Sequence, residues 1–320
     1  MTTPILHISR VPISHIELND FSYSILPFKM VVQPDNLIEQ INKTGILPPP
    51  VVKEQGAGSY SVVSGWQSLA TAQAMSLSSI DCFIVPAETT DLNIFTIVLS
   101  ETISQHTVSP IEKAVFFQKV TQICSMEEAV KMFLPLLNLP QRSAVITQLL
   151  SLVNLEQPIS EAVHKGQIAE KAAYELAKMS FRDRMILFEA ISDLRLSVSN
   201  QRKLINYCTD LSLRNESSIL AIFSSDEVQE IINHKEANPP QKAANLMSFL
   251  ESALSPRLAE ATKSFNSLKN SLKLPKWATL SHATAFEKDA LTLSLTFKNN
   301  QSLSEFCKTK LSSNSRKDEI

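Results

Sequence analysis

Hydrophobic and polar positions between residues 31 and 85 follow a recognisable order. Asp35 precedes the apolar residues Leu37, Ile38 and Ile41 at helical spacing, which predicts a short helix capped by Asp35. Prolines at positions 48–50 exclude a continued helix. Apolar residues at 51–52 and 60–63 flank a Gly-Ala-Gly turn, so this stretch predicts a β-hairpin.

A second helix and a further strand follow the predicted hairpin. Gly65 ends the hairpin, and the alanine-rich residues 67–75 predict a helix with an apolar face. Residues 80–85 predict a buried strand that Pro86 ends. Residues 91–99 are apolar, and their pattern leaves helix and strand open. The resulting order is helix, strand, turn, strand, glycine, helix, strand.

The pattern from residue 109 onward is helical. Ser109, Pro110 and Glu112 form a capping-box sequence that predicts a helix start. Further helices are predicted at 126–137 and 141–152, joined by a tight turn. In the second of these helices, Ser143 and Thr147 lie opposite an apolar stripe. Two helices joined in this way, the second with a polar face, are typical of a helix-turn-helix.

The remaining pattern predicts more helices and a small mixed unit at the end. Residues 181–235 indicate helices that carry arginines and lysines among acidic residues. After Asn238 and two prolines come an amphipathic basic helix at 256–274, two strands and a last helix that we expect Ser302 to cap. We expect an α+β, mainly helical protein with four parts: residues 1–105, 106–237 and 238–311, and a disordered tail at 312–320.

Two groups of segments resemble the ParB family over roughly residues 10–180. The first group, LIEQINKTGILPPPVV, YSVVSGWQSLATAQAMSL and IDCFIV, is similar to the N-terminal domain that ParB shares in fold with sulfiredoxin. The second, VSPIEKAVFFQKV, QRSAVITQLLSLVNL and ISEAVHKGQIAEKAAYELAKM, is similar to the ParB central domain. No cysteine lies near Gly65, so sulfiredoxin activity is not expected.

The resemblance implies DNA binding through the helix that begins near residue 141. By position, the side chains that would face the major groove are Arg142, Ser143, Thr147 and Gln148. It also implies a homodimer that reads two half-sites, with a ParA-type ATPase as a possible partner.

The family's nucleotide motif is degenerate in this chain. In ParB the glycine precedes glutamate and two arginines that hold the triphosphate of CTP, whereas here Gly65 precedes Trp66, Gln67 and Ser68. Amide and hydroxyl groups cannot replace the charged guanidinium fork on phosphate. Glu101 is retained from the next motif, so Gly65, Gln67 and Glu101 form the candidate cofactor site. The missing arginines disfavour bound CTP, CTPase activity and nuclease activity.

Composition narrows the remaining function classes. Apolar residues make up 44% of the chain, the mean hydropathy is 0.00 and the net charge is −2, typical of an ordinary globular protein. No apolar run has the length of a membrane span, so a cytoplasmic protein is expected. The resemblance to ParB implies that it is nucleoid-associated. The acidic excess lies before residue 110, which favours the later part for any polyanion.

The chemistry of catalytic and metal sites is missing from the pattern. The four cysteines lack paired spacing and are expected to be reduced and mostly buried, and the six histidines lack ligand spacing. His106 adjoins the degenerate motif and is expected to be an exposed loop residue.

The leading hypothesis is a sequence-specific DNA-binding ParB-like protein, a partition or regulatory factor. The alternatives are an interaction module on the ParB scaffold without DNA or nucleotide binding, and a divergent CTP-binding clamp.

Overall fold

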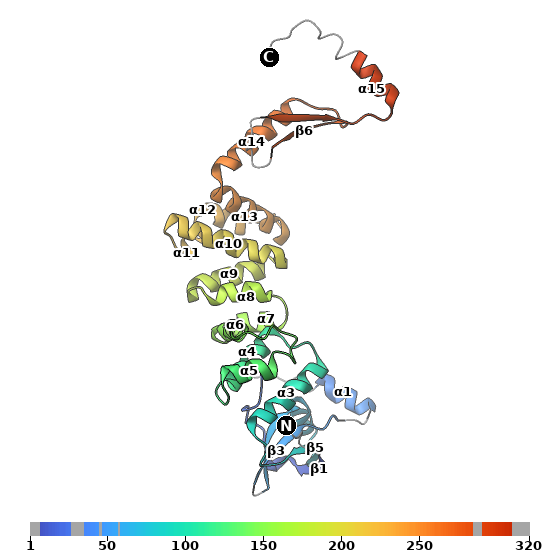
Figure 1. The fold of residues 1–320 in the computed structure, drawn as a ribbon, viewed down its shortest axis with the longest axis vertical. Coiled ribbons are helices and arrows are strands. Elements are labelled where there is room, and N and C mark those ends of the chain that lie inside the picture. The colour runs from blue at the N-terminus through green and yellow to red at the C-terminus, as the bar shows by residue number, and fades with distance from the viewer. Residues whose placement is uncertain (1–6, 27–34, 45–46, 57, 284–289, 309–320) are drawn as a thin grey trace. The chain divides into compact units, whose positions relative to one another are not determined.

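The protein has an α+β, mainly helical fold, as the sequence predicts (Figure 1). A computed structural model describes residues 7–26, 35–44, 47–56, 58–283 and 290–308. The chain divides into two compact units, Met1–Ile205 and Asn206–Ile320, and the division falls inside helix α10 (Val198–Asn215). The four-part division expected from the sequence stays a prediction.

A five-stranded mixed sheet forms the N-terminal part of the first unit. Its strands are β1 (His7–Pro12), β2 (Ile16–Glu17), β3 (Val51–Gly56), β4 (Ser59–Ser64) and β5 (Ser79–Val85). They lie in the order β1-β5-β3-β4-β2, with β3 parallel to β5 and antiparallel to β4. The antiparallel β3–β4 pair confirms the predicted hairpin.

The first strand ends at a proline. β1 ends at Pro12, and a short 3-10 helix, η1 (Ile13–His15), leads into β2. Proline has no N–H to donate to a sheet, so the ladder with β5 stops there. The turn lets β2 pair with β4 at the opposite edge of the sheet.

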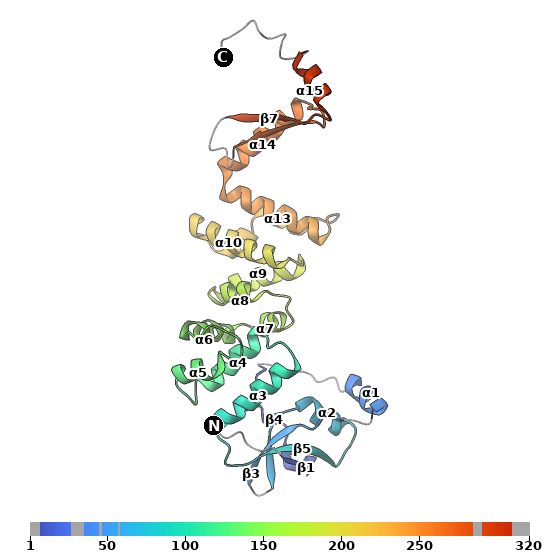
Figure 2. The ribbon, with the colours of Figure 1, turned by 45° about the vertical axis from the view of Figure 1, so that its right-hand side comes forward.

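Three helices accompany this sheet (Figure 2). They are α1 (Asp35–Thr44), α2 (Trp66–Ala74) and α3 (Asp91–Gln105). Leu69 and Ala72 of α2 are buried in one cluster with Val52, Val62 and Cys82 of the sheet. Residues 91–99, left open by their pattern, are helical, and the Thr90 side chain accepts from the Asn93 N–H at the start of α3.

The rest of the first unit is helical and is organised around one helix. Its elements are α4 (Pro110–Val120), α5 (Met126–Phe133), α6 (Ser143–Leu150), the 3-10 turn η2 (Ser151–Asn154), α7 (Gln157–His164), α8 (Glu170–Ala177) and α9 (Phe181–Asp193). The predicted capping box at Ser109 and Glu112 is present. In α4, Phe116 makes edge-to-face contacts with Phe95, Phe117 and Phe133, at centroid distances of 5.9, 5.3 and 5.0 Å.

Helix α5 is shorter than predicted. The pattern favours a helix to residue 137, but regular helix ends at Phe133 and hydrogen-bonded turns continue to Asn138. Pro135 supplies no N–H and its ring clashes with a carbonyl one turn earlier, which stops the helix. Asn138 then takes a left-handed conformation with φ 54°, and the connection to α6 is longer than the expected tight turn.

The second unit contains the last helices and a two-stranded sheet. Its further elements are α11 (Ile219–Phe223), α12 (Asp226–Ile232), α13 (Pro239–Leu254), α14 (Pro256–Ser271), β6 (Ala278–His282), β7 (Leu291–Leu295) and α15 (Asn300–Phe306). Asn238 caps α13, with Pro239 in its first turn. Asn299, rather than the predicted Ser302, caps α15, because its side chain accepts from the Ser302 N–H. The predicted tail lies outside the described residues.

Replacing Phe133 by alanine should strongly destabilise the first unit. The side chain is fully buried against Phe116, and deleting a buried phenyl ring leaves a cavity. We expect Phe133→Ala to lower the free energy of unfolding by about 3–5 kcal/mol, measured by urea denaturation. Leu136→Ala, at a position 43% exposed, is the control and should change stability by less than about 0.5 kcal/mol. Equal effects would contradict this account of the core.

Candidate nucleic-acid interface

Helix α6 has one face in the core and one face in solvent. Ile146 and Leu149 are fully buried, and α6 packs on α4 and η2. Pro140 precedes the helix, and Arg142 stands at its N-cap in an extended conformation. Among the described residues, the helix packs through its apolar face, and the side chains on its opposite face are exposed.

The four residues predicted to face DNA are all exposed. Arg142 and Ser143 lie at the start of α6, and Thr147 and Gln148 follow one turn later. The Thr147 hydroxyl donates to the Ser143 carbonyl at 3.2 Å. Arg142 and Gln148 have the longest polar side chains on this face. The structure thus brings these residues together on one surface, while their role stays a prediction.

Gly65, the first candidate cofactor residue, makes a tight turn between β4 and α2. Its φ is 84°, in the left-handed region, and a Cβ placed there would lie 2.7 Å from Cα of Pro50. Glycine is therefore required by the approach of two backbone segments. This explains the residue without a bound ligand.

The groups after Gly65 do not fit a nucleotide triphosphate. Gln67 is exposed and neutral, and Ser68 is buried. Trp66 stacks on Phe21 with centroids 6.0 Å apart and its Nε1–H donates to the Asp20 carbonyl at 3.3 Å. The first turn of α2 thus offers no cation to phosphate oxygens.

Glu101 of α3 has unequal carboxylate oxygens. Gln105 Nε2 donates to Oε1 at 3.0 Å, and Oε2 is buried without a hydrogen-bond partner. Within the described part of the chain, no hydrogen bond or ion pair joins Glu101 to Gln67. The three candidate cofactor residues therefore do not form one connected polar site.

Tyr23, in the loop after β2, links that loop to α3. Its hydroxyl donates to Asp91 Oδ1 at 2.6 Å, and Lys53 Nζ lies 3.3 Å from the same oxygen. The hydrogen bond from Tyr23, helped by Lys53, holds the pKa of Asp91 below its ordinary value, although partial burial acts in the opposite direction. Burial and the hydrogen bond to Asp91 raise the pKa of Tyr23.

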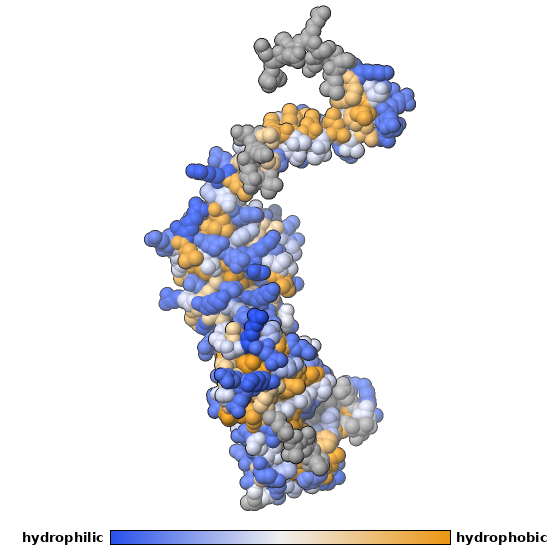
Figure 3. Space-filling view, viewed as in Figure 1, coloured by the Kyte–Doolittle hydropathy of each residue, from blue (hydrophilic) through white to orange (hydrophobic). Residues whose placement is uncertain are grey.

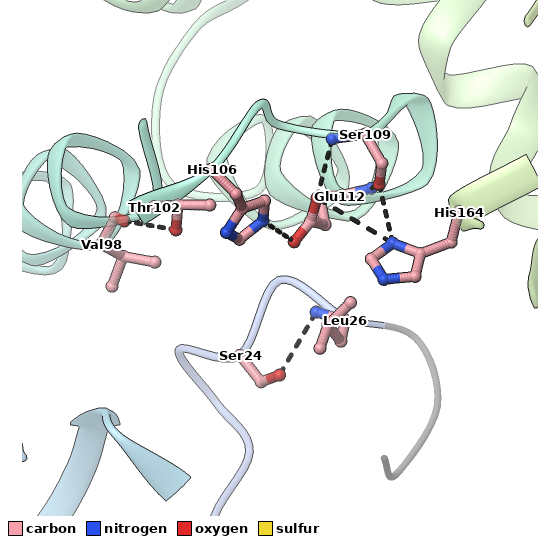
Figure 4. Close-up of polar contacts among 8 residues, drawn as sticks. All are labelled: Ser24, Leu26, Val98, Thr102, His106, Ser109, Glu112 and His164. Atoms are coloured by element: carbon pink, nitrogen blue, oxygen red, sulfur yellow. Dashed lines mark hydrogen bonds and ion pairs between the residues drawn. The ribbon is translucent and has the colours of Figure 1, made fainter. Parts of the chain in front are cut away.

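A buried carboxylate at the start of α4 joins three helices (Figure 4). Glu112 Oε1 lies 2.9 Å from Nε2 of His106, and Oε2 accepts the Ser109 N–H at 2.7 Å. The Ser109 hydroxyl lies 2.9 Å from Nδ1 of His164 at the end of α7. His106 is exposed in the loop after α3, as its sequence position favours, and its ring also contacts Glu112.

This cluster holds a serine, a histidine and a glutamate, but it is not a nucleophilic triad. The Nδ1 atom of His164 is the one near both Ser109 and Glu112, at 2.9 and 4.0 Å. A triad needs the two ring nitrogens on different partners. The Ser109 hydroxyl also accepts the Glu112 N–H as a helix cap. Sequence reasoning missed His164 because 55 residues separate it from Ser109.

The basic residues of α9 and α10 are only partly available to an anion. Arg184 donates through Nε to both oxygens of Glu156, at 3.1 and 2.8 Å, and is not free to contact phosphate. Burial tends to raise the pKa of Glu156, but the hydrogen bonds from Arg184 and a main-chain N–H lower it. Arg182, Arg195 and Arg202 are exposed.

The described residues show no metal site, disulfide or membrane-spanning helix. There, no group of three or more histidine, cysteine or acidic side chains could hold a metal ion. The four cysteines are free, with Cys82 and Cys208 buried and the other two half-buried. No helix in the described ranges has the length and apolarity to cross a membrane.

Comparison with known proteins finds ParB-type relatives by sequence. The chain is 24% identical to the nucleoid occlusion protein of Geobacillus sp. (strain WCH70) over 193 residues, covering 60% of this chain and 66% of that protein. It is 23% identical to the probable chromosome-partitioning protein ParB of Campylobacter jejuni over 198 residues, or 62% and 66% of the two chains. The matches span just under two thirds of each relative. No family model matches.

A solved structure of the same type also matches. It is the C-terminally truncated chromosome-partitioning protein ParB from Caulobacter crescentus complexed to the centromeric parS site, 19% identical, with a TM-score of 0.36. The match covers 62% of this chain and 98% of that one. The class that the sequence relatives define is that of ParB-type partitioning and nucleoid occlusion proteins. This chain is similar to these proteins at 23–25% identity.

Removing the Tyr23 hydroxyl should change how stability depends on pH. Because the folded pKa of Asp91 lies below its unfolded value, the Asp91 interaction stabilises the fold above about pH 4 and is lost as pH falls through the lowered pKa. We expect Tyr23→Phe to cost about 1 kcal/mol at pH 7 and less toward pH 2. Urea denaturation at several pH values measures this difference.

Tyr60→Phe provides the control for this series. Tyr60 is half-buried in β4, and removing its hydroxyl should give a stability change that does not vary with pH. A Tyr23→Phe deficit that stays constant between pH 7 and pH 2 would show that Asp91 is not the group affected.

Proposed function

We propose that the chain binds specific DNA sites through α6, as a homodimer that acts in partition or regulation. The observation that carries the proposal is the exposed polar face of α6 opposite its buried Ile146 and Leu149. An eight-residue helix is about 12 Å long, which suits the major groove. The similarity to ParB-type partitioning and nucleoid occlusion proteins supports the same role.

The chemistry of α6 assigns different roles to its residues. Arg142 can donate two hydrogen bonds to a guanine edge or bind a phosphate, and Gln148 can pair with adenine. Ser143 and Thr147 offer hydroxyls to either strand. A single arginine on the helix gives each chain a small electrostatic contribution, so two half-sites are needed for firm binding.

The Arg142→Ala variant tests the recognition helix. We expect it to weaken binding to a selected genomic site by about 5- to 100-fold, the loss typical of one base or phosphate contact. Gel shifts at about 50 and 200 mM salt measure affinity and its salt dependence. Lys171→Ala removes an equal charge from an exposed position on α8 and should have little effect.

The same gel shifts decide between DNA binding and a pure interaction module. Absence of salt-sensitive binding by the wild type at about 50 mM salt would refute the DNA proposal. Equal losses in Arg142→Ala and Lys171→Ala would place the DNA elsewhere on the surface.

For the proposed homodimer, the β6–β7 hairpin and α14 of the second unit are the candidate surface. In the β6–β7 hairpin, Leu280 and Leu293 are paired across the strands, and Leu280 is buried while Leu291 and Leu293 are 46% and 52% exposed. Leu268 and Leu272 of α14 are also exposed, and apolar side chains gather over this unit in Figure 3. An open apolar surface of this kind is typical of an interface.

Charging the hairpin should therefore weaken self-association. We expect Leu293→Glu to raise the dimer dissociation constant by at least tenfold, because burying each leucine contributes about 1.5–3 kcal/mol and the change occurs in both chains. Sedimentation equilibrium measures it. Leu77→Glu, at an exposed position after α2, is the control and should leave association unchanged. A monomeric wild type would contradict the dimer. A ParA-type ATPase partner stays a prediction from the family.

A further inference from the structure

The loop segment Asp20–Leu26, which we name the clasp, contacts several elements of the first unit. At its start, the Asp20 carbonyl accepts the indole N–H of Trp66, and Phe21 stacks on the same indole with an angle of 13° between the rings. These contacts join the clasp to the first turn of α2. They occupy the Trp66 side chain at the point where the family's nucleotide motif begins.

Lys119 of α4 holds the next two residues of the clasp. Its Nζ donates to the carbonyl of Phe21 at 2.7 Å and to the carbonyl of Ser22 at 2.9 Å. Burial lowers the pKa of Lys119, because the charged ammonium is partly removed from water. A charged donor on two backbone carbonyls forms strong hydrogen bonds, so α4 is tied directly to this loop.

Tyr23 extends the same attachment to α3. Its ring is buried and contacts Phe95 edge-to-face at 5.6 Å, and its hydroxyl binds Asp91. The clasp is also ordered within itself, since the Ser24 N–H donates to the Phe21 carbonyl and the Leu26 N–H to the Ser24 hydroxyl. The clasp is thus held by contacts with α2, α3 and α4 of the same chain.

The clasp contacts lie directly beside the degenerate motif. Gln67 and Ser68 stand where the family has its two phosphate-binding arginines, and Trp66 packs under Phe21. We propose that the clasp permanently fastens α4 to α2 and α3, so that CTP neither binds this chain nor changes the position of the helices behind α4. The clasp lies within the first unit, and its role does not depend on DNA binding.

Hydrogen exchange of the wild type with CTP and Mg²⁺ is the first test. Calorimetry up to about 1 mM CTP should give no saturable heat, and exchange of backbone amides in the clasp and in α4 should be the same with and without CTP. Saturable binding, or slower exchange in either segment when CTP is present, would overturn the proposal.

The Lys119→Met variant tests the attachment itself. It keeps the aliphatic length of the side chain but removes both hydrogen bonds to the clasp. Exchange of the Ser24 and Leu26 amides should accelerate about tenfold or more, since hydrogen bonds to charged groups contribute roughly that much to a local opening equilibrium.

Lys113→Met is the matched control, because Lys113 lies on the same helix and lines an open cavity beside His106. Its exchange pattern in the clasp should equal that of the wild type. If Lys119→Met and Lys113→Met give the same clasp exchange, the attachment is refuted.

A second variant keeps the test decisive if Lys119→Met does not fold. Trp66→Phe preserves a ring against Phe21 and removes only the N–H that binds the Asp20 carbonyl. We expect a severalfold acceleration confined to the clasp, with the thermal midpoint nearly unchanged. Unaltered exchange in the clasp would overturn the proposal.

Discussion

The packing of Phe116 against three other phenyl rings is the interaction on which the first unit depends. Phe95 comes from α3, Phe117 from α4 itself and Phe133 from α5, so one side chain joins three helices. Edge-to-face aromatic pairs combine a large buried area with a preferred geometry. Helix α4 consequently packs between α3, which lies next to the sheet, and α5.

Both ends of α4 are fixed by polar contacts that complement this apolar core. At its start, Glu112 is buried between the capping Ser109 and His106, and His164 brings in the end of α7. Near its end, Lys119 donates to two carbonyls of the loop before α1. Buried polar groups that are fully paired select one arrangement of the neighbouring elements. The exposed face of α6 therefore has a defined position relative to α4.

The divergence of this chain from the ParB pattern has a consistent physical basis. Gly65 is retained because the backbone of Pro50 leaves no room for a Cβ, whereas the arginines that would bind phosphate are absent. Trp66 packs against Phe21 instead of leaving an open loop for a ligand. The turn therefore has the glycine that its backbone geometry requires, and the neutral Gln67 and Ser68 follow where the ParB pattern has arginines.

The sequence by itself determined the elements whose signals are local. The hairpin of β3 and β4, the capping box of α4 and the amphipathic α6 follow from residues a few positions apart, because caps, turns and side-chain periodicity act over that range. The exposed set Arg142, Ser143, Thr147 and Gln148 was predictable from the same periodicity.

Only the tertiary structure decided the contacts between residues distant in the chain. The pairing of Ser109 with His164, of Tyr23 with Asp91 and of Lys119 with Phe21 joins residues 55, 68 and 98 positions apart. Sequence pattern alone left residues 91–99 open between helix and strand. Which polar groups meet in the core depends on how helices and sheet pack together, and that packing is a property of the whole unit.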